Sequence, residues 1–148
     1  MYTIQNQQKK SHSPFSYANP HQKTVLYIED DLANIQLVEQ IIERRNDLRI
    51  LTANSCHGGI MMAQDFQPDV IVMDINLPDL NGFEALEILR NDPITAHIPI
   101  MALSAAAHPE QIDKGIKAGF FMYMTKPFHI DDFMKAIDAT IFSSIKIH

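Results

Sequence analysis

The sequence contains one cysteine, Cys56, and no long apolar run. One thiol can form neither an internal disulfide nor a cysteine-rich zinc site, so a reducing compartment is the natural one. The N-terminus lacks the apolar core of a secretion signal, and no segment approaches the roughly 20 apolar residues that a membrane span needs. We therefore expect a cytoplasmic chain that makes no membrane contact.

An excess of positive charge is also missing. The formal net charge is -6, and the few Lys and Arg residues are scattered along the chain. This distribution offers no basic face, so we expect no direct contact with nucleic acid. At 148 residues, of which 46% are hydrophobic and 20% charged, the chain is long enough for one domain with a substantial core.

Composition divides the chain into three segments. Residues 1–23 are rich in Gln, Ser, Asn, Pro and Lys, which predicts a disordered tail or linker. Strand-like and helix-like patterns then alternate five times over residues 24–142, which predicts a doubly wound α/β domain. Residues 143–148 are expected to form a short C-terminal tail.

Each of four short apolar runs ends on a residue suited to phosphate or to a hard metal ion. The runs are residues 25–28 before Glu29, Asp30 and Asp31, 70–73 before Asp74, 100–103 before Ser104, and 121–125 before Lys126. Such runs are typical of buried parallel strands, whose carboxyl ends meet at one edge of the sheet. We expect these polar side chains to converge there.

Helices are expected between the strands, over residues 32–44, 55–66, 83–93, 109–118 and 129–141. Asp31 is a good N-cap for the first, and Pro109 suits the opening turn of the fourth. Gly119 is the expected residue after the end of that helix. Gly58 and Gly59 weaken the first turn of the second helix, because glycine costs up to about 1 kcal/mol relative to alanine there.

The converging residues form a candidate site for phosphoryl chemistry. Glu29, Asp30 and Asp74 offer the hard oxygen ligands that Mg²⁺ prefers. Lys126 and Ser104 could stabilise phosphoryl oxygens, and a carboxylate such as Asp74 can accept phosphate as an acyl phosphate. Taken singly, each has a structural alternative as a helix-terminal acid, a turn residue or a solvated loop residue. Their joint occurrence favours a functional site over these separate structural roles.

Four strings carry a family resemblance: VLYIEDD, VIVMDINLPDLNGFE, PIMALSA and YMTKPF. In this order and spacing they resemble the receiver domain of two-component response regulators, over about residues 24–141. The resemblance implies a flavodoxin-like, five-stranded parallel sheet of order 2-1-3-4-5 with five helices. It also implies a signalling domain that catalyses its own phosphorylation and slow dephosphorylation.

The resemblance assigns a role to each site residue. Asp74 would accept the phosphoryl group, Asp30 and Asp74 would bind Mg²⁺ directly, and Glu29 would act through a bound water. The backbone carbonyl of Asn76 would complete the protein ligands. Glu29 replaces the aspartate that is more frequent in the family, and its extra methylene moves the carboxylate outward. We expect this difference to weaken metal binding moderately.

The remaining implied roles concern the response to phosphorylation. Lys126 would pair with Asp74 at rest and with the phosphoryl oxygens afterwards, and the peptide bond between Lys126 and Pro127 would be cis. Ser104 and Tyr123 resemble the switch pair, in which the hydroxyl moves toward the phosphoryl group and the aromatic ring turns into the vacated space. A local charge is thereby converted into a change of surface.

Partners follow from the same resemblance. A histidine kinase or a histidine phosphotransfer protein would donate the phosphoryl group, and a downstream protein would read the altered surface. The chain is either a stand-alone receiver or the terminal receiver of a hybrid kinase, and a weak or phosphorylation-dependent dimer is a further hypothesis. Two alternatives stay open: a receiver-like binding module that signals without phosphate, and a phosphohydrolase of the haloacid dehalogenase type. The second is disfavoured because Asn76 stands where that class requires an acid.

Overall fold

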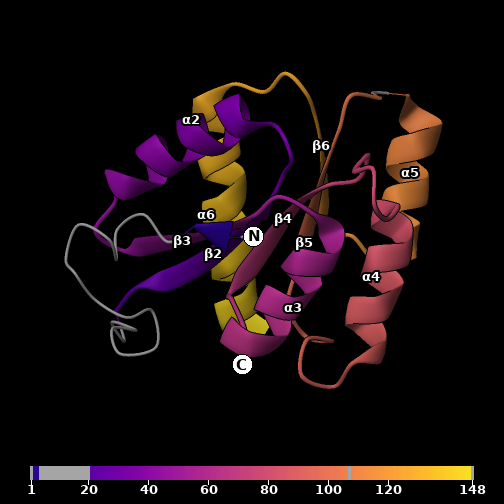
Figure 1. Ribbon diagram of the computed structural model, residues 1–148, viewed down its shortest axis with the longest axis horizontal. Helices are drawn as coiled ribbons and strands as arrows, with labels where there is room; N and C mark the ends of the chain where they lie inside the picture. The colour runs from indigo at the N-terminus through magenta and orange to yellow at the C-terminus, as the bar shows by residue number, and fades with distance from the viewer. Residues whose placement is uncertain (1, 4–20, 107, 148) are drawn as a thin grey trace.

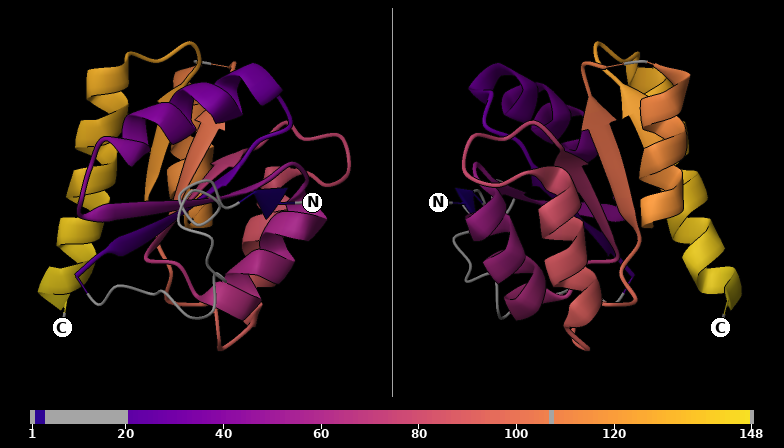
Figure 2. Two further views of the ribbon diagram at one scale, coloured as in Figure 1. Left: turned by 60° about the vertical axis from the view of Figure 1, so that its left-hand side comes forward. Right: turned by 90° about the vertical axis from the view of Figure 1, so that its right-hand side faces the viewer.

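The computed structural model describes residues 2–3, 21–106 and 108–147. A central sheet carries helices on both faces, with α2 and α6 on one and α3, α4 and α5 on the other (Figures 1 and 2). The strands are β1 (Tyr2–Thr3), β2 (Lys23–Ile28), β3 (Leu48–Ala53), β4 (Val70–Asp74), β5 (Ile100–Ser104) and β6 (Met122–Thr125). The helices are α2 (Leu32–Glu43), α3 (Cys56–Phe66), α4 (Gly82–Asn91), α5 (Pro109–Ala118) and α6 (Ile130–Ile147).

The strands lie in the order β1-β3-β2-β4-β5-β6. Strands β2 to β6 are parallel, and their order is the expected 2-1-3-4-5 of a flavodoxin-like sheet. Among the residues described, five helices complete the predicted fold class. Strands β3, β4 and β5 are buried along their whole length, as expected of parallel strands covered on both faces.

The sixth strand, β1, was not predicted. It pairs antiparallel with β3, with Tyr2 opposite Ala53 and Thr3 opposite Thr52. The expectation of an unstructured tail over residues 1–23 is therefore wrong for these two residues and for Lys23, which begins β2. An edge strand such as β3 presents unpaired backbone groups that a short extended segment can satisfy. Residues 4–20 lie outside the described part of the chain.

Asp31 caps α2 as predicted, and two further helices also begin at a side-chain cap. The side chains of Asp31, Ser55 and Asn81 accept hydrogen bonds from the first turns of α2, α3 and α4. Helix α5 opens at Pro109 and is followed by Gly119 with a φ of 122°. Helix α6 continues to Ile147, so residues 143–147 of the segment predicted as a C-terminal tail are helical. Those residues include no glycine or proline that would end the helix earlier.

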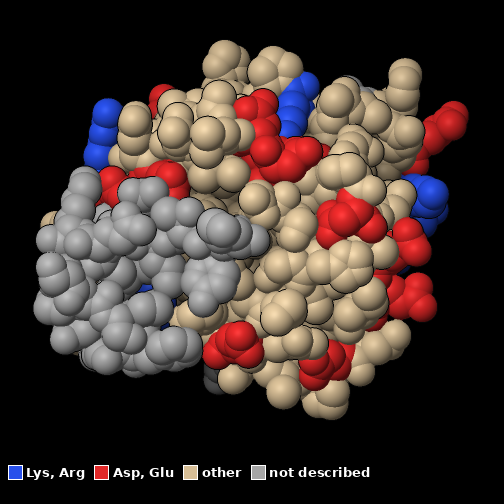
Figure 3. Space-filling model, viewed as in Figure 1, with Lys and Arg blue, Asp and Glu red and all other residues tan. Residues whose placement is uncertain are grey.

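Surface properties of the described residues agree with the composition. The face shown in Figure 3 carries more acidic than basic side chains. Within the described ranges, no helix combines the length and the apolar character that crossing a bilayer requires.

Gly59 lies where α3 packs against β2, and a side chain at this position would not fit. A Cβ atom at this position would lie 2.3 Å from Cδ1 and 2.6 Å from Cγ1 of Ile28, whose side chain is completely buried in β2. The helix therefore approaches the sheet as closely as it does because residue 59 has no side chain.

We predict that Gly59→Ala lowers the free energy of unfolding by about 1–2 kcal/mol, because the overpacking cost exceeds the gain in helix propensity. Gly58→Ala, one position along and half-buried, is the matched control and should be neutral or stabilising. Urea denaturation of both variants measures the difference. Equal effects at the two positions would contradict the packing argument.

Candidate functional site

The candidate residues lie at the carboxyl ends of four strands, β2, β4, β5 and β6, along one edge of the sheet. Parallel pairing places Ile28 beside Met73, Asp74 beside Leu103, and Ser104 beside Thr125. The residues that end or follow these strands therefore lie next to one another, although they are far apart in sequence. The convergence expected from the sequence is present.

Three acids form the centre of this edge. One carboxylate oxygen each from Glu29, Asp30 and Asp74 can be chosen so that all lie within 4.8 Å of one another. Glu29 is fully buried and Asp74 is 8% exposed, whereas Asp30 is exposed. Hard oxygen donors at this spacing, open to solvent on one side, suit a small divalent cation such as Mg²⁺.

Lys126 joins two of the acids. Its ammonium donates a hydrogen bond to Asp74 Oδ2 at 2.9 Å and another to Glu29 Oε1. The lysine side chain is 19% exposed, so both ion pairs are largely shielded from water. Removing one member of such a group leaves an uncompensated charge, which is costly in a partly buried position.

The environment moves the pKa values of these groups in different directions. Burial raises the pKa of Glu29, and this effect outweighs the opposing one of Lys126. Burial also acts to raise the pKa of Asp74, but hydrogen bonds from Lys126 and the Asn76 amide lower it overall. For Lys126, burial acts to lower the pKa, and the two carboxylates raise it overall. Asp74 is thus a charged carboxylate at neutral pH.

Asn76 links the acids to Ser104. Its backbone N–H donates to Asp74 Oδ1 at 2.9 Å, and its side-chain amide donates to Ser104 Oγ at 3.4 Å. The buried Ser104 hydroxyl also accepts a hydrogen bond from the Ala106 N–H at 3.1 Å. The serine side chain is therefore held beside the acidic centre by two donors.

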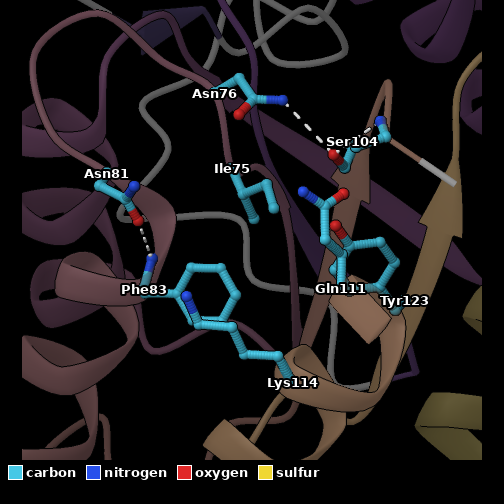
Figure 4. Close-up of a pocket in the computed structure, with 9 residues that line it drawn as sticks. Ile75, Asn76, Asn81, Phe83, Ser104, Gln111, Lys114 and Tyr123 are labelled. Carbon is cyan, nitrogen blue, oxygen red and sulfur yellow. Dashed lines mark hydrogen bonds between the residues drawn. The ribbon is translucent and has the colours of Figure 1, made fainter. Parts of the chain in front are cut away.

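Ser104 and Tyr123 line the same cavity, which has a volume of about 210 Å³ (Figure 4). Gly115 of α5 packs against the half-buried tyrosine ring, since a Cβ atom there would lie 2.6 Å from Tyr123 Cδ2. On the other side of the cavity, the Lys114 ammonium lies 4.9 Å from the centre of the Phe83 ring, a cation–π contact that joins α5 to α4. The peptide bond between Lys126 and Pro127 is cis.

Comparisons with known proteins show which family the chain resembles. The family model for the response regulator receiver domain matches residues 25–138. The cell cycle response regulator CtrA of Brucella ovis is 36% identical over 117 residues, which are 79% of this chain and 49% of that protein.

The chain belongs to the response regulator receiver family. Its fold matches the receiver domain of the Francisella response regulator 1452 with a TM-score of 0.77 and 29% identity, covering 83% of this chain and 99% of that one. The chemotaxis response regulator CheY4 of Vibrio cholerae matches with a TM-score of 0.74 and 25% identity, covering 80% and 98%. The receiver spans about half the length of the curated relatives that it matches.

Two contacts in this receiver were missed by the sequence reasoning. The Tyr27 hydroxyl donates to Glu29 Oε1 at 3.0 Å. The only sequence signal was a hydroxyl-bearing aromatic residue two positions before the acid, on the same side of the strand.

The second contact involves Asp79, in the loop after Asp74, which accepts hydrogen bonds from the N–H groups of Cys56 and His57 at 3.0 Å each. No local pattern links Asp79 to a helix 22 residues away.

Asp79 anchors the loop that follows Asp74, the candidate phospho-acceptor, to the first turn of α3. It also contacts the His57 ring at 2.7 Å. Partial burial acts to raise the pKa of Asp79, but the hydrogen bonds from His57 and Cys56 lower it to about 2. The folded-state pKa is thus below the usual value near 3.9. The resulting stabilisation is complete above about pH 4 and is lost as the pH falls toward 2.

We predict that Asp79→Ala lowers the free energy of unfolding at pH 7 by about 1–2 kcal/mol, as expected for loss of a helix cap. The difference from the unsubstituted receiver should shrink between pH 4 and pH 2. Asn81→Ala is the matched control, because Asn81 caps α4 at 2.7 Å with a side chain that does not titrate. Urea denaturation at several pH values measures both. An Asp79 effect that stays constant with pH would contradict the charge argument.

Proposed function

We propose that this receiver accepts a phosphoryl group on Asp74 in a two-component phosphorelay, with a histidine kinase or a histidine phosphotransfer protein as donor. One observation carries the proposal: a charged, largely buried Asp74 lies within hydrogen-bonding distance of Lys126 and beside Glu29 and Asp30. A nucleophilic carboxylate, a fixed cation and two further acids are the groups that such a transfer needs. We place this chemistry in the cytoplasm, in keeping with the single cysteine.

Mg²⁺ is the proposed cofactor. Asp30 and Asp74 would bind it directly, Glu29 would do so through a water molecule, and the backbone carbonyl of Asn76 would complete the protein ligands. Bound there, the ion would neutralise charge on the phosphoryl oxygens. During transfer, an oxygen of Asp74 forms the new O–P bond while the N–P bond of the phosphohistidine breaks and the imidazole keeps the electron pair. Lys126 then moves from Asp74 to the phosphoryl oxygens.

The proposed switch uses the cavity that Ser104 and Tyr123 share. After phosphorylation the serine hydroxyl turns toward the phosphoryl group and gives up its bonds to Asn76 and Ala106. The tyrosine ring, which already lines the same cavity, moves into the vacated space. The surface formed by α5, β6 and α6 changes as a result, and a downstream protein binds the changed surface. A weak or phosphorylation-dependent dimer through this surface belongs to the same proposal.

The experiment is incubation with acetyl phosphate and Mg²⁺, followed by intact-protein mass spectrometry. We expect one added phosphoryl group, none in Asp74→Asn, and none after Mg²⁺ is removed by a chelator. Asp65→Asn, an exposed aspartate on α3, is the matched control and should behave like the unsubstituted chain. Beryllofluoride with Mg²⁺ should give a stable adduct with the same dependence on Asp74.

The other outcomes identify the alternative functions. A folded chain that gains no adduct from either reagent is a binding module that signals without phosphate. Release of many phosphate molecules for each protein molecule, without accumulation of an adduct, indicates a phosphohydrolase. Either result would overturn the proposal.

A further inference from the structure

The two oxygens of the Glu29 carboxylate are held very differently. Oε1 accepts hydrogen bonds from the Lys126 ammonium, from the Tyr27 hydroxyl at 3.0 Å and from the Asn34 side-chain amide at 3.4 Å. Oε2 accepts one long hydrogen bond, from the Asp31 N–H at 3.4 Å. One oxygen is therefore committed to protein donors, whereas the other has capacity for a further partner.

Tyr27 is the most deeply buried of these donors. It lies on β2, two residues before Glu29 and on the same side of the strand, and it is completely buried. Its ring packs edge-on against Phe133 of α6, with ring centres 6.2 Å apart, and Phe133 stacks on Phe128 at 4.7 Å. A buried hydroxyl needs an acceptor, and Glu29 supplies it.

We propose that Tyr27 is a positioning residue for the metal site. By holding Oε1 of Glu29 on the protein side, its hydroxyl turns Oε2 toward the place where Asp30 and Asp74 would bind a divalent cation and its water. The inference rests on the proposed Mg²⁺-dependent function.

This arrangement gives a physical reason why glutamate serves at position 29. The longer side chain has more rotamers than aspartate, so it needs an additional anchor to present one oxygen consistently. An aspartate there would end one C–C bond, about 1.5 Å, earlier and would fall short of the Tyr27 hydroxyl. The tyrosine and the glutamate thus act as a pair.

The test is a double-mutant cycle on Mg²⁺ affinity, measured by calorimetric titration of the full chain. Tyr27→Phe removes only the hydroxyl and should weaken Mg²⁺ binding about tenfold, the lower end for loss of a group that orients a metal ligand. In a Glu29→Asp background the same substitution should change the affinity less than twofold, because the hydroxyl no longer has this carboxylate to orient. Urea denaturation of all four proteins reports stability separately.

The outcomes separate this inference from the proposed function. If the unsubstituted chain binds no Mg²⁺, the proposed function itself fails. If it binds Mg²⁺ and Tyr27→Phe has no effect, or the same effect in both backgrounds, Tyr27 does not position Glu29. If Tyr27→Phe does not fold, the NMR shift of the Tyr27 Cζ carbon gives a second reading. Mg²⁺ should move this shift in the unsubstituted chain and not in Glu29→Asp, and equal behaviour in the two would overturn the inference.

Discussion

The structure depends on one ammonium group placed between two largely buried carboxylates. Lys126 follows the last strand of the sheet, and its partners Glu29 and Asp74 are 97 and 52 residues away in sequence. Without the lysine, two like charges would be buried close together, which is strongly unfavourable. The lysine can reach both only if β2, β4 and β6 are parallel and in register. The ion pairs therefore depend on the sheet topology.

The same arrangement is well suited to switching. A cation shared between two carboxylates can move to a newly attached phosphoryl group without leaving a buried charge unpaired, because that group brings its own negative charge. Asn76 connects Asp74 to Ser104, and Ser104 shares a cavity with Tyr123 next to α5. Charge at the acidic centre is thus linked, through a short series of contacts, to the packing of a helix on the surface.

Patterns of residues close together in sequence predicted most of the fold. The four apolar runs marked β2, β4, β5 and β6 of the parallel sheet. Asp31, Pro109 and Gly119 marked helix ends, because caps and turns depend on local backbone chemistry. The convergence of Asp74 and Lys126 was also predictable, since parallel strands bring their carboxyl ends together. These features need no knowledge of side-chain packing.

The remaining features depend on contacts between distant segments. Strand β1 pairs with the edge of β3, about 50 residues away in sequence, and α3 packs closely because Gly59 fits against Ile28. The roles of Tyr27 and Asp79 depend on the acceptor or donor that the fold happens to place beside each of them. A single sequence records such residues without their partners, so these contacts became visible only in three dimensions.

The most direct test of the central claim is the pKa of Asp74 itself, measured by NMR titration of its carboxyl carbon in the unsubstituted chain and in Lys126→Met. The account predicts a pKa below the usual value near 3.9 in the unsubstituted chain. It also predicts a clear rise when the ammonium is removed. An Asp74 pKa that is the same in both proteins would show that Lys126 does not hold the acidic centre together.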